Sequence, residues 1–443
     1  MSNSDSEQSA ESTQPSPWYR RIGPGLITTC VVIGPGSIMA SSSVGANEQY
    51  SMLWVVAVAV AFMMLFTTLG AKLGAVADDS PCQLLRKKAG AWLAVAVGIS
   101  IFFISAAFQS GNNIGAAAAF EAFVDSKTLV AILIVAFNAL ALAFLFLFQN
   151  MYKMLERLMA TFVGIMLVCF TVNLIFLKPD LVGIASGFIP SLGKSDEMLP
   201  VLGLIGTTFV SGAAFYQAYL VRQKGWKPED LPSGLLDARM GTSLMFLITV
   251  MLMSTAAAGL YTGEKVTLAN PVEVASALDA TFGSMAKIIF CAGLFCAAYS
   301  SFLINSMIGG FMAADGLGLG SKPEERGPKI LTAAVLLIGM GVGLAVLLFD
   351  FDRTPTLLAA QATTVVVSPL VAGALLWLTS SSDVMGSSKN RPLVLAAGCL
   401  GLALLIAIAC KTAFVDLPNK FDKYLYPAPT TASALDLTST ENN

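Results

Sequence analysis

The sequence predicts an all-α integral membrane protein with about eleven transmembrane helices. Of its 443 residues, 56% are hydrophobic and only 12% are charged, and the mean hydropathy is +0.74, whereas soluble domains carry about 25% charged residues. A helix needs about 20 mostly apolar residues to span a bilayer. Eleven stretches approach or exceed that length, at 24–46, 52–77, 91–120, 128–149, 155–177, 200–221, 240–261, 284–312, 329–349, 356–379 and 392–413.

The ionisable residues exclude several classes of function. The chain contains 26 basic and 28 acidic residues and no histidine. Histidine-ligated metals and Ser-His-Asp catalysis are therefore ruled out, and the balanced charge offers no basic surface for nucleic acid. No nucleophile stands beside a base in the apolar stretches, so we expect no enzyme activity and no cofactor.

The distribution of polar segments predicts the domain organisation. Residues 1–19 are rich in Ser, Gln and Glu and are expected to form a disordered cytoplasmic tail. Residues 20–414 form the transmembrane domain, and residues 415–443 form a polar C-terminal tail. Within the domain we expect two five-helix repeats and one extra helix, at about 20–178, about 200–380 and 392–413 respectively.

The positions of Lys and Arg predict the orientation in the membrane. Most of them, including Arg20, Arg21, Arg222 and Lys322, fall in the tail and loops on the N-terminal side of the bilayer. Cytoplasmic loops carry an excess of Lys and Arg. We therefore expect a cytoplasmic N-terminus, an external C-terminus and a location in the cell membrane, either plasma or inner.

Two apolar stretches contain residues that interrupt a helix. The first holds Gly34-Pro35-Gly36, and the sixth holds Ser211-Gly212, one turn after Thr207 and Thr208. Proline lacks the amide hydrogen that a helix needs, and glycine adds backbone freedom. Transporters built from inverted repeats bind their cargo where the first helix of each half is broken. An ordinary proline kink is the other interpretation of the first interruption.

The chain resembles the Nramp divalent-metal transporters. The segment from Gly23 to Trp54 resembles that family's first helix and the loop after it. Ser300, Ser301, Asn305, Gly309, Gly310 and Asp315-Gly316 are similar to the family's eighth helix, and Gln361 with Pro369 is similar to its tenth. The resemblance implies a LeuT-type fold of two inverted five-helix repeats, with helices 1 and 6 broken at mid-membrane.

The resemblance also implies where cargo binds and how this chain departs from the family. Gly34, Ser37 and Val210 stand where the family has its metal-binding Asp, Asn and Met, and Gln109 and Asn112 stand where it has an acidic pair. The implied substrate-binding residues are Val31, Gly34, Ser37, Thr207, Val210 and Gln361, of which Ser37 and Gln361 are the candidate metal ligands.

The remaining carboxylates lie away from the centre of the membrane. The acids fall in tails, loops or helix ends, with Glu121, Asp237 and Asp315 within about one turn of an end. We expect Glu48 and Asp315 to be solvated caps. A proton-coupled step that needs a buried acid has no evident residue, so proton coupling is doubtful. Uncharged oxygen donors favour a hard ion such as Mg over Mn or Fe.

Other polar residues allow two interpretations each. Gln109 and Asn112 share a helix face and could line the permeation path or form hydrogen bonds between helices. For Asn138 we expect interhelical bonding. Gln361, Thr364 and Ser368 form one helical stripe, in which we assign function to Gln361 and structure to the other two.

These observations predict a secondary transporter of the Nramp type that moves a metal cation. One alternative is the same fold carrying a neutral or zwitterionic organic solute, and another is a sensor that does not transport. The expected partners are the lipid bilayer and the transported cation or small solute. We expect no nucleic acid and no obligate protein partner.

Overall fold

The chain is helical throughout the part that its structure covers. A computed structural model describes residues 23–124, 126–147, 151–191, 199–266, 268, 271–349, 351 and 353–416, and no strand occurs in those ranges. The tail predicted at 1–19 lies outside them. The helices are α1 (Pro24–Val32), α2 (Pro35–Glu48), α3 (Leu53–Val76), α4 (Pro81–Ala89), α5 (Ala91–Glu121), α6 (Lys127–Leu147), α7 (Met151–Leu177), α8 (Leu181–Ser186), α9 (Leu199–Thr208), α10 (Ser211–Lys224), α11 (Leu231–Gly259), α12 (Pro271–Phe282), α13 (Ser284–Leu317), α14 (Arg326–Leu348), α15 (Arg353–Ser380), α16 (Ser382–Met385) and α17 (Pro392–Lys411).

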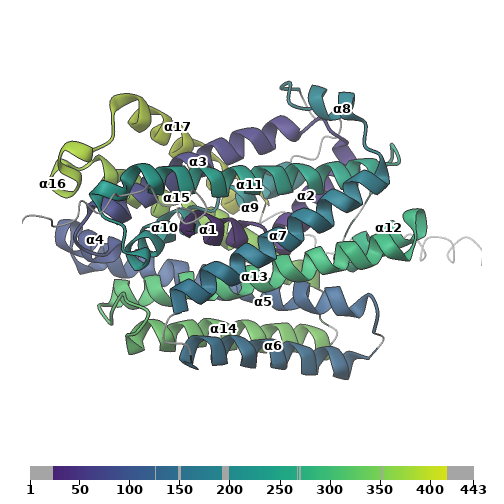
Figure 1. Cartoon of the computed structure of the whole chain (residues 1–443), viewed down its shortest axis with the longest axis horizontal. Helices are drawn as coiled ribbons and strands as arrows, with labels where there is room; N and C mark the ends of the chain where they lie inside the picture. Colours follow the sequence, from purple (N-terminus) through teal and green to yellow (C-terminus); the bar gives the residue numbers. More distant parts are fainter. Residues whose placement is uncertain are drawn as a thin grey trace, which may run out of the picture.

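The long helices agree in number with the predicted spans. Over the described ranges, nine helices are long and apolar enough to cross a membrane, and up to eleven do so if each of two bent helix pairs is one span. They run along the long axis of the molecule in Figure 1, so that α4 and α16 lie near one end and α8 and α12 near the other.

Proline and glycine set many of the helix boundaries. Proline occupies the first turn of α1, α2, α4 and α17, where the missing amide hydrogen costs no intrahelical bond. Gly225 after α10 and Gly318 after α13 adopt the left-handed conformation, with φ of 79° and 78°. Glycine tolerates that conformation without steric cost, so both helices end there.

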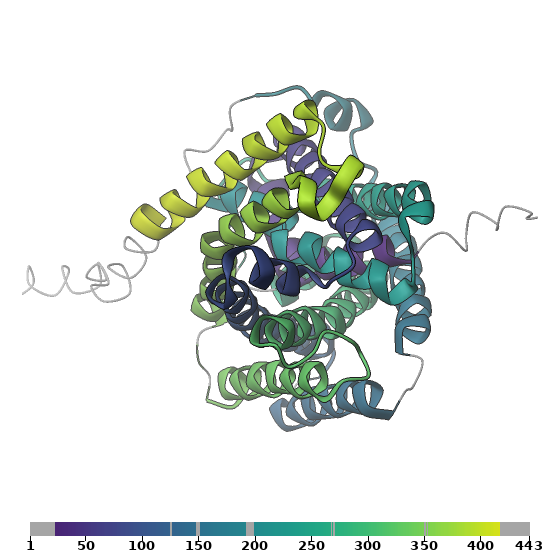
Figure 2. The same ribbon diagram turned by 90° about the vertical axis from the view of Figure 1, so that its left-hand side faces the viewer.

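Two pairs of short consecutive helices, α1 with α2 and α9 with α10, occupy the middle of the bundle. In the span formed by α9 and α10, 89% of the most apolar window is buried inside the protein, compared with 33% for α6. Figure 2 looks along the bundle and shows α6, α14 and α17 at its periphery. The central helices are thus enclosed by protein, whereas the outer ones present apolar side chains outward, as a bilayer requires.

Small residues allow α3 and α10 to approach closely. A Cβ atom placed on Gly70 would overlap the carbonyl oxygen of Ala214, and one on Gly74 would overlap that of Ala218. Helices in membranes use small residues in this way because packing, rather than burial from water, holds them together.

We expect Gly70→Ala to destabilise the protein. Its methyl group would overlap backbone on α10, and overpacking of this kind costs about 1–3 kcal/mol. Thermal unfolding of the purified protein should show a midpoint about 5 °C lower. Gly164→Ala on α7 is the matched control, since a Cβ there meets no atom within 4 Å. Equal midpoints for the two variants would contradict this account of the contact.

Candidate functional site

The first break lies between α1 and α2. Helix α1 ends at Val32 and α2 begins at Pro35, and the two axes are bent by 59°. The side chain of Ser37 closes the gap, because its Oγ donates to the Gly34 carbonyl at 3.0 Å and accepts from the Gly34 amide at 3.1 Å. A single hydroxyl therefore bridges the two backbone groups of Gly34, which also bond to the Val32 carbonyl and the Ile38 amide.

The second break lies between α9 and α10. Helix α9 ends at Thr208 and α10 begins at Ser211, with Val210 in an extended conformation. Thr207 Oγ1 donates back to the carbonyl of Gly203 at 2.9 Å. The C-termini of two half-helices and the N-termini of two others thus occur close to the centre of the fold.

The sequence located both breaks with a small error. Of the predicted residues only Gly34 is outside a helix, while Pro35, Gly36, Ser211 and Gly212 are the first residues of α2 and α10. Proline is favoured in a first helical turn, so Pro35 starts a helix instead of lying in the gap. The residues in the gaps are Ile33 with Gly34, and Phe209 with Val210.

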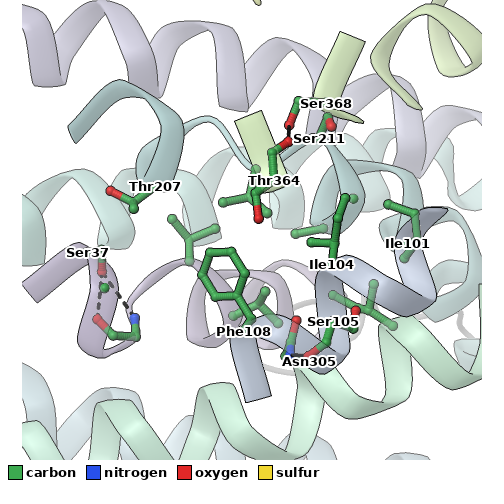
Figure 3. A pocket seen from close by; sticks show the side chains of 18 of the residues that line it. Ser37, Ile101, Ile104, Ser105, Phe108, Thr207, Ser211, Asn305, Thr364 and Ser368 are labelled. Carbon is green, nitrogen blue, oxygen red and sulfur yellow. Dashed lines mark hydrogen bonds between the residues drawn. The ribbon is translucent and has the colours of Figure 1, made fainter. Parts of the chain in front are cut away.

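A small cavity of about 30 Å³ lies against both breaks. That volume holds about two water molecules. Figure 3 shows Ser37 and Thr207 on one side of the Phe108 ring, with Ile101 and Ile104 on the other. The lining residues are Val31, Val32, Gly34, Gly36, Ser37, Ile101, Ile104, Ser105, Phe108, Asn112, Thr207, Val210, Ser211, Gly212, Ala213, Asn305, Ile308, Thr364 and Ser368.

The lining is uncharged and mixed in character. Its polar side chains are hydroxyls and two amides, Asn112 and Asn305, and the Asn305 amide donates to the Ser105 carbonyl at 2.8 Å. Its large apolar side chains include Phe108 and Ile308. Within the described ranges, no group of three or more Cys, Asp or Glu side chains could hold a metal ion. The site can therefore offer neutral oxygen donors and apolar contact.

Two neighbouring helices occupy the space next to Gly34. A Cβ atom placed on Gly34 would lie 2.9 Å from Ser301 Oγ and 3.5 Å from Asn112 Oδ1. Ser301 Oγ donates to the carbonyl of Val31 at 3.2 Å. The last turn of α1 is thus bonded to α13, and a side chain larger than hydrogen at position 34 has no free room.

Helix α5 carries a connected set of amides that leads away from the cavity. Asn112 donates to Gln109 Oε1 at 3.3 Å, Asn113 donates to the Gln109 carbonyl, and Asn138 donates to Asn113 Oδ1 at 2.8 Å. Asn138 is therefore an interhelical bonding residue, as predicted. Asn112 lines the cavity, whereas Gln109 is not among its lining residues.

The acids near helix ends are buried, which corrects one prediction. Glu48 is 3% exposed and Asp315 is 1% exposed, so neither is a solvated cap. Asp315 accepts from Ser80 Oγ at 2.7 Å and from the Tyr219 hydroxyl at 2.6 Å. Ser80, just before α4, and Tyr219 on α10 replace the water that we expected around this carboxylate.

Asp237 holds the start of α1. Its carboxylate accepts from the amide of Gly23 at 2.6 Å and from that of Gly25 at 2.6 Å. A negative charge at a helix N-terminus is stabilising because it meets free amides and the positive end of the helix dipole. Asp237 on α11 therefore binds the N-terminal end of α1, the first half-helix.

The structure brings most of the predicted binding residues together. Val31, Gly34, Ser37, Thr207 and Val210 all line the cavity. Gln361 lies within α15, but its side chain is outside the described part of the chain. Thr364 and Ser368, which we assigned to structure, also line the cavity.

One helix face was predicted only in part, since the sequence reasoning named Asn112 but missed Ile101, Ser105 and Phe108. Ile101, Ser105, Phe108 and Asn112 on α5 line the cavity. They are spaced by four, three and four residues, which places them on a single helix face. That spacing was visible in the sequence, but only the position of the breaks shows that this face is turned to a cavity.

Comparison with known proteins gives a consistent result. Residues 25–414 match the family model described as natural resistance-associated macrophage protein-like. The divalent metal cation transporter MntH of Verminephrobacter eiseniae is 26% identical over 411 residues, covering 90% of each chain. A crystal structure of a mutant Eremococcus coleocola manganese transporter covers 95% of this chain and 91% of its own, at 19% identity and a TM-score of 0.77. MhsT in complex with L-phenylalanine aligns over 87% of this chain and 98% of its own, at 14% identity and a TM-score of 0.53.

Proposed function

The chain belongs to the Nramp family, and from that membership we propose that it transports a metal cation through the cavity between its two broken helices. The likeness to solved transporters identifies the LeuT-type fold. The observation that supports the proposal is the position of the cavity, which is lined by residues of both breaks. In this fold such breaks bind ions with free carbonyls and orient helix dipoles toward charged cargo.

The donors favour a hard ion. Ser37, Thr207, Asn112 and Asn305 present neutral oxygens to the cavity, and no thioether or carboxylate occurs among the lining residues. Neutral oxygens suit Mg better than they suit Mn or Fe. We propose Mg as the preferred ion, carried without protons, because the lining offers no group that titrates near neutral pH.

Uptake into proteoliposomes tests this proposal. We expect saturable Mg uptake, reported by an internal dye, with weaker Mn uptake and no change in an internal pH indicator. Internal acidification that accompanies the ion would show proton coupling and contradict the uniport. Absence of uptake with both ions, from protein shown to be folded, would contradict metal transport and favour a sensor.

We expect Ser37→Ala to lower the uptake rate about tenfold. The substitution removes two hydrogen bonds to Gly34, each worth about 0.5–1.5 kcal/mol, and one of the oxygen donors of the lining. Ser43→Ala, also on α2, is the matched control, because Ser43 is not among the lining residues. Initial rates of Mg uptake at equal protein density provide the comparison. Similar rates for both variants would argue against a role for Ser37.

The apolar part of the lining supports a second candidate. Ile101, Ile104, Phe108 and Ile308 face the cavity, and sites for small organic molecules are mostly apolar with a few placed polar groups. A neutral or zwitterionic solute is therefore the alternative cargo. Counterflow of a labelled amino acid that is insensitive to Mg and Mn would favour it over the cation.

The orientation is also part of the proposal. We place the N-terminus in the cytoplasm and the C-terminus outside, from the distribution of Lys and Arg. Labelling of a cysteine added at residue 2, in intact cells with an impermeant maleimide, tests this. Labelling without permeabilisation would reverse the orientation.

A further inference from the structure

A second cavity lies at one end of the bundle. It has a volume of about 550 Å³ and is bordered by the end of α10, the start of α7 and the connection from α13 to α14. This end, near α4, is on the left in Figure 1 and faces the viewer in Figure 2. The cavity shares no lining residue with the one at the breaks. We call it the basal vestibule, and its volume is typical of a site for a small ligand.

Basic side chains outnumber acidic ones in the basal vestibule. Four line it, namely Lys153, Arg222, Lys224 and Lys322, against the two acids Glu156 and Glu324. Lys224 Nζ lies 3.1 Å from Glu156 Oε1, so one acid is already paired. Behind the wall, Asp315 is bonded to the lining residues Ser80 and Tyr219.

The Arg222 side chain on α10 is held in place by neutral backbone groups. The Arg222 guanidinium donates to the carbonyls of Ala77 and Asp78, at 2.5 and 2.6 Å. Those carbonyls hold the guanidinium in place, and its charge also interacts with the buried Asp315 carboxylate. Lys153 and Lys322 are exposed at the rim. The vestibule therefore presents one fixed and two exposed positive charges to a ligand that enters it.

Two lining side chains also contain buried polar atoms without a hydrogen bond of good geometry, although the Tyr216 hydroxyl lies close enough to Gln223 to interact with it. Both amide atoms of Gln223 and the hydroxyl of Tyr152 are buried without a hydrogen-bond partner. Such a group costs about 1–3 kcal/mol when left unpaired. Gln223 Nε2 and the Tyr152 hydroxyl are donors, so a ligand with several acceptor oxygens would satisfy both.

We propose that the basal vestibule binds a phosphate-bearing anion. Lysine and arginine are the side chains that proteins use for phosphate, lysine as a point charge and arginine as a planar fork of donors. Neutral donors from Gln223 and Tyr152 complete the set of contacts. The anion is either a soluble phosphate compound or the headgroup of a lipid, since both present the same oxygens.

Binding measurements on the purified full-length protein test the proposal. Pyrophosphate is the soluble probe, titrated in a calorimeter in the presence of EDTA, because divalent ions would chelate it. Nanodiscs of phosphatidylglycerol and of phosphatidylcholine provide the lipid arm, read out by co-purified lipid. No transported cargo is present, so the outcome is separate from that of the uptake experiments.

Two variants and one control make the test specific. We expect the double variant Lys153→Ala/Lys322→Ala to weaken binding at least tenfold, and Gln223→Leu, which changes no charge, to do the same. Lys227→Ala/Lys389→Ala removes two exposed charges outside the vestibule and should change affinity less than twofold. Circular dichroism and thermal unfolding verify that each variant is folded.

The source of the ligand follows from which arm responds. Pyrophosphate binding that both variants weaken would support a soluble ligand. Enrichment of phosphatidylglycerol that both variants abolish, without pyrophosphate binding, would support a lipid headgroup. The proposal is overturned if neither probe binds, or if Gln223→Leu and Lys153→Ala/Lys322→Ala bind as the unaltered protein does.

Discussion

Gly34→Asp is expected to reduce ion uptake about a hundredfold, although the sequence resemblance places an aspartate of the family at this position. The new Cβ would lie 2.9 Å from Ser301 Oγ, and overpacking costs about 1–3 kcal/mol. The carboxylate would also be buried next to Asn112 Oδ1 without a cationic partner, which adds a further penalty. Each 1.4 kcal/mol corresponds to a factor of ten.

Removing the obstructing hydroxyl should reverse part of this loss. Gly34→Asp/Ser301→Ala gives the carboxylate room and frees the Val31 carbonyl that Ser301 now holds. We expect uptake of both ions to recover, since an anionic ligand compensates better for dehydration of a divalent ion. Gly34→Asn is the matched control, because it has nearly the same shape without the charge.

The measurement is initial uptake of each ion in proteoliposomes at equal protein density. Unchanged uptake in Gly34→Asp would contradict the clash with Ser301 and the cost of burying the carboxylate. Equal loss in Gly34→Asp and Gly34→Asn would assign the effect to size alone. No recovery in the double variant would contradict the role given to Ser301.

Asp237→Ala is expected to release the first half-helix. The substitution leaves the buried amides of Gly23 and Gly25 without their acceptor, and hydrogen bonds to charged groups contribute about 1.5–3 kcal/mol each. Opening of α1 should therefore become about a hundredfold more frequent. Asp237→Asn retains one acceptor oxygen and should give an intermediate effect.

A native thiol reports this opening. Cys30 lies on α1 and is fully buried, as is Cys82 on α4. Mass spectrometry of maleimide-treated protein should show faster labelling of Cys30 in Asp237→Ala, with Cys82 unchanged. Equal acceleration at both thiols would indicate general destabilisation, and an unchanged rate at Cys30 would contradict the role of Asp237 in holding α1.

The features predicted from sequence are those with a local cause. Apolar length fixes the spans, and Gly34-Pro35 marks the first break because proline cannot continue a helix. The second break at Phe209 and Val210 has no such signal, since neither residue interrupts a helix by itself. Ser211 and Gly212 were the nearest indication, and they begin α10.

The features that could not be predicted depend on residues far apart in the chain. Asp237 bonds to amides more than 200 positions away, and Ser301 bonds to the Val31 carbonyl on another helix. A sequence shows that Asp237 is near a helix end but not which backbone comes to it. The burial of Asp315 by Ser80 and Tyr219 was missed for the same reason.

The uncharged lining of the cavity at the breaks has a consequence for energetics. None of its side chains changes charge between pH 5 and 8, so a bound divalent ion would bring its full charge through the membrane. Two charges moving through 100 mV gain about 4.6 kcal/mol, which corresponds to roughly a thousandfold accumulation. Membrane voltage would then set the ion gradient: accumulation above the external concentration would persist in alkaline medium and be lost on depolarisation.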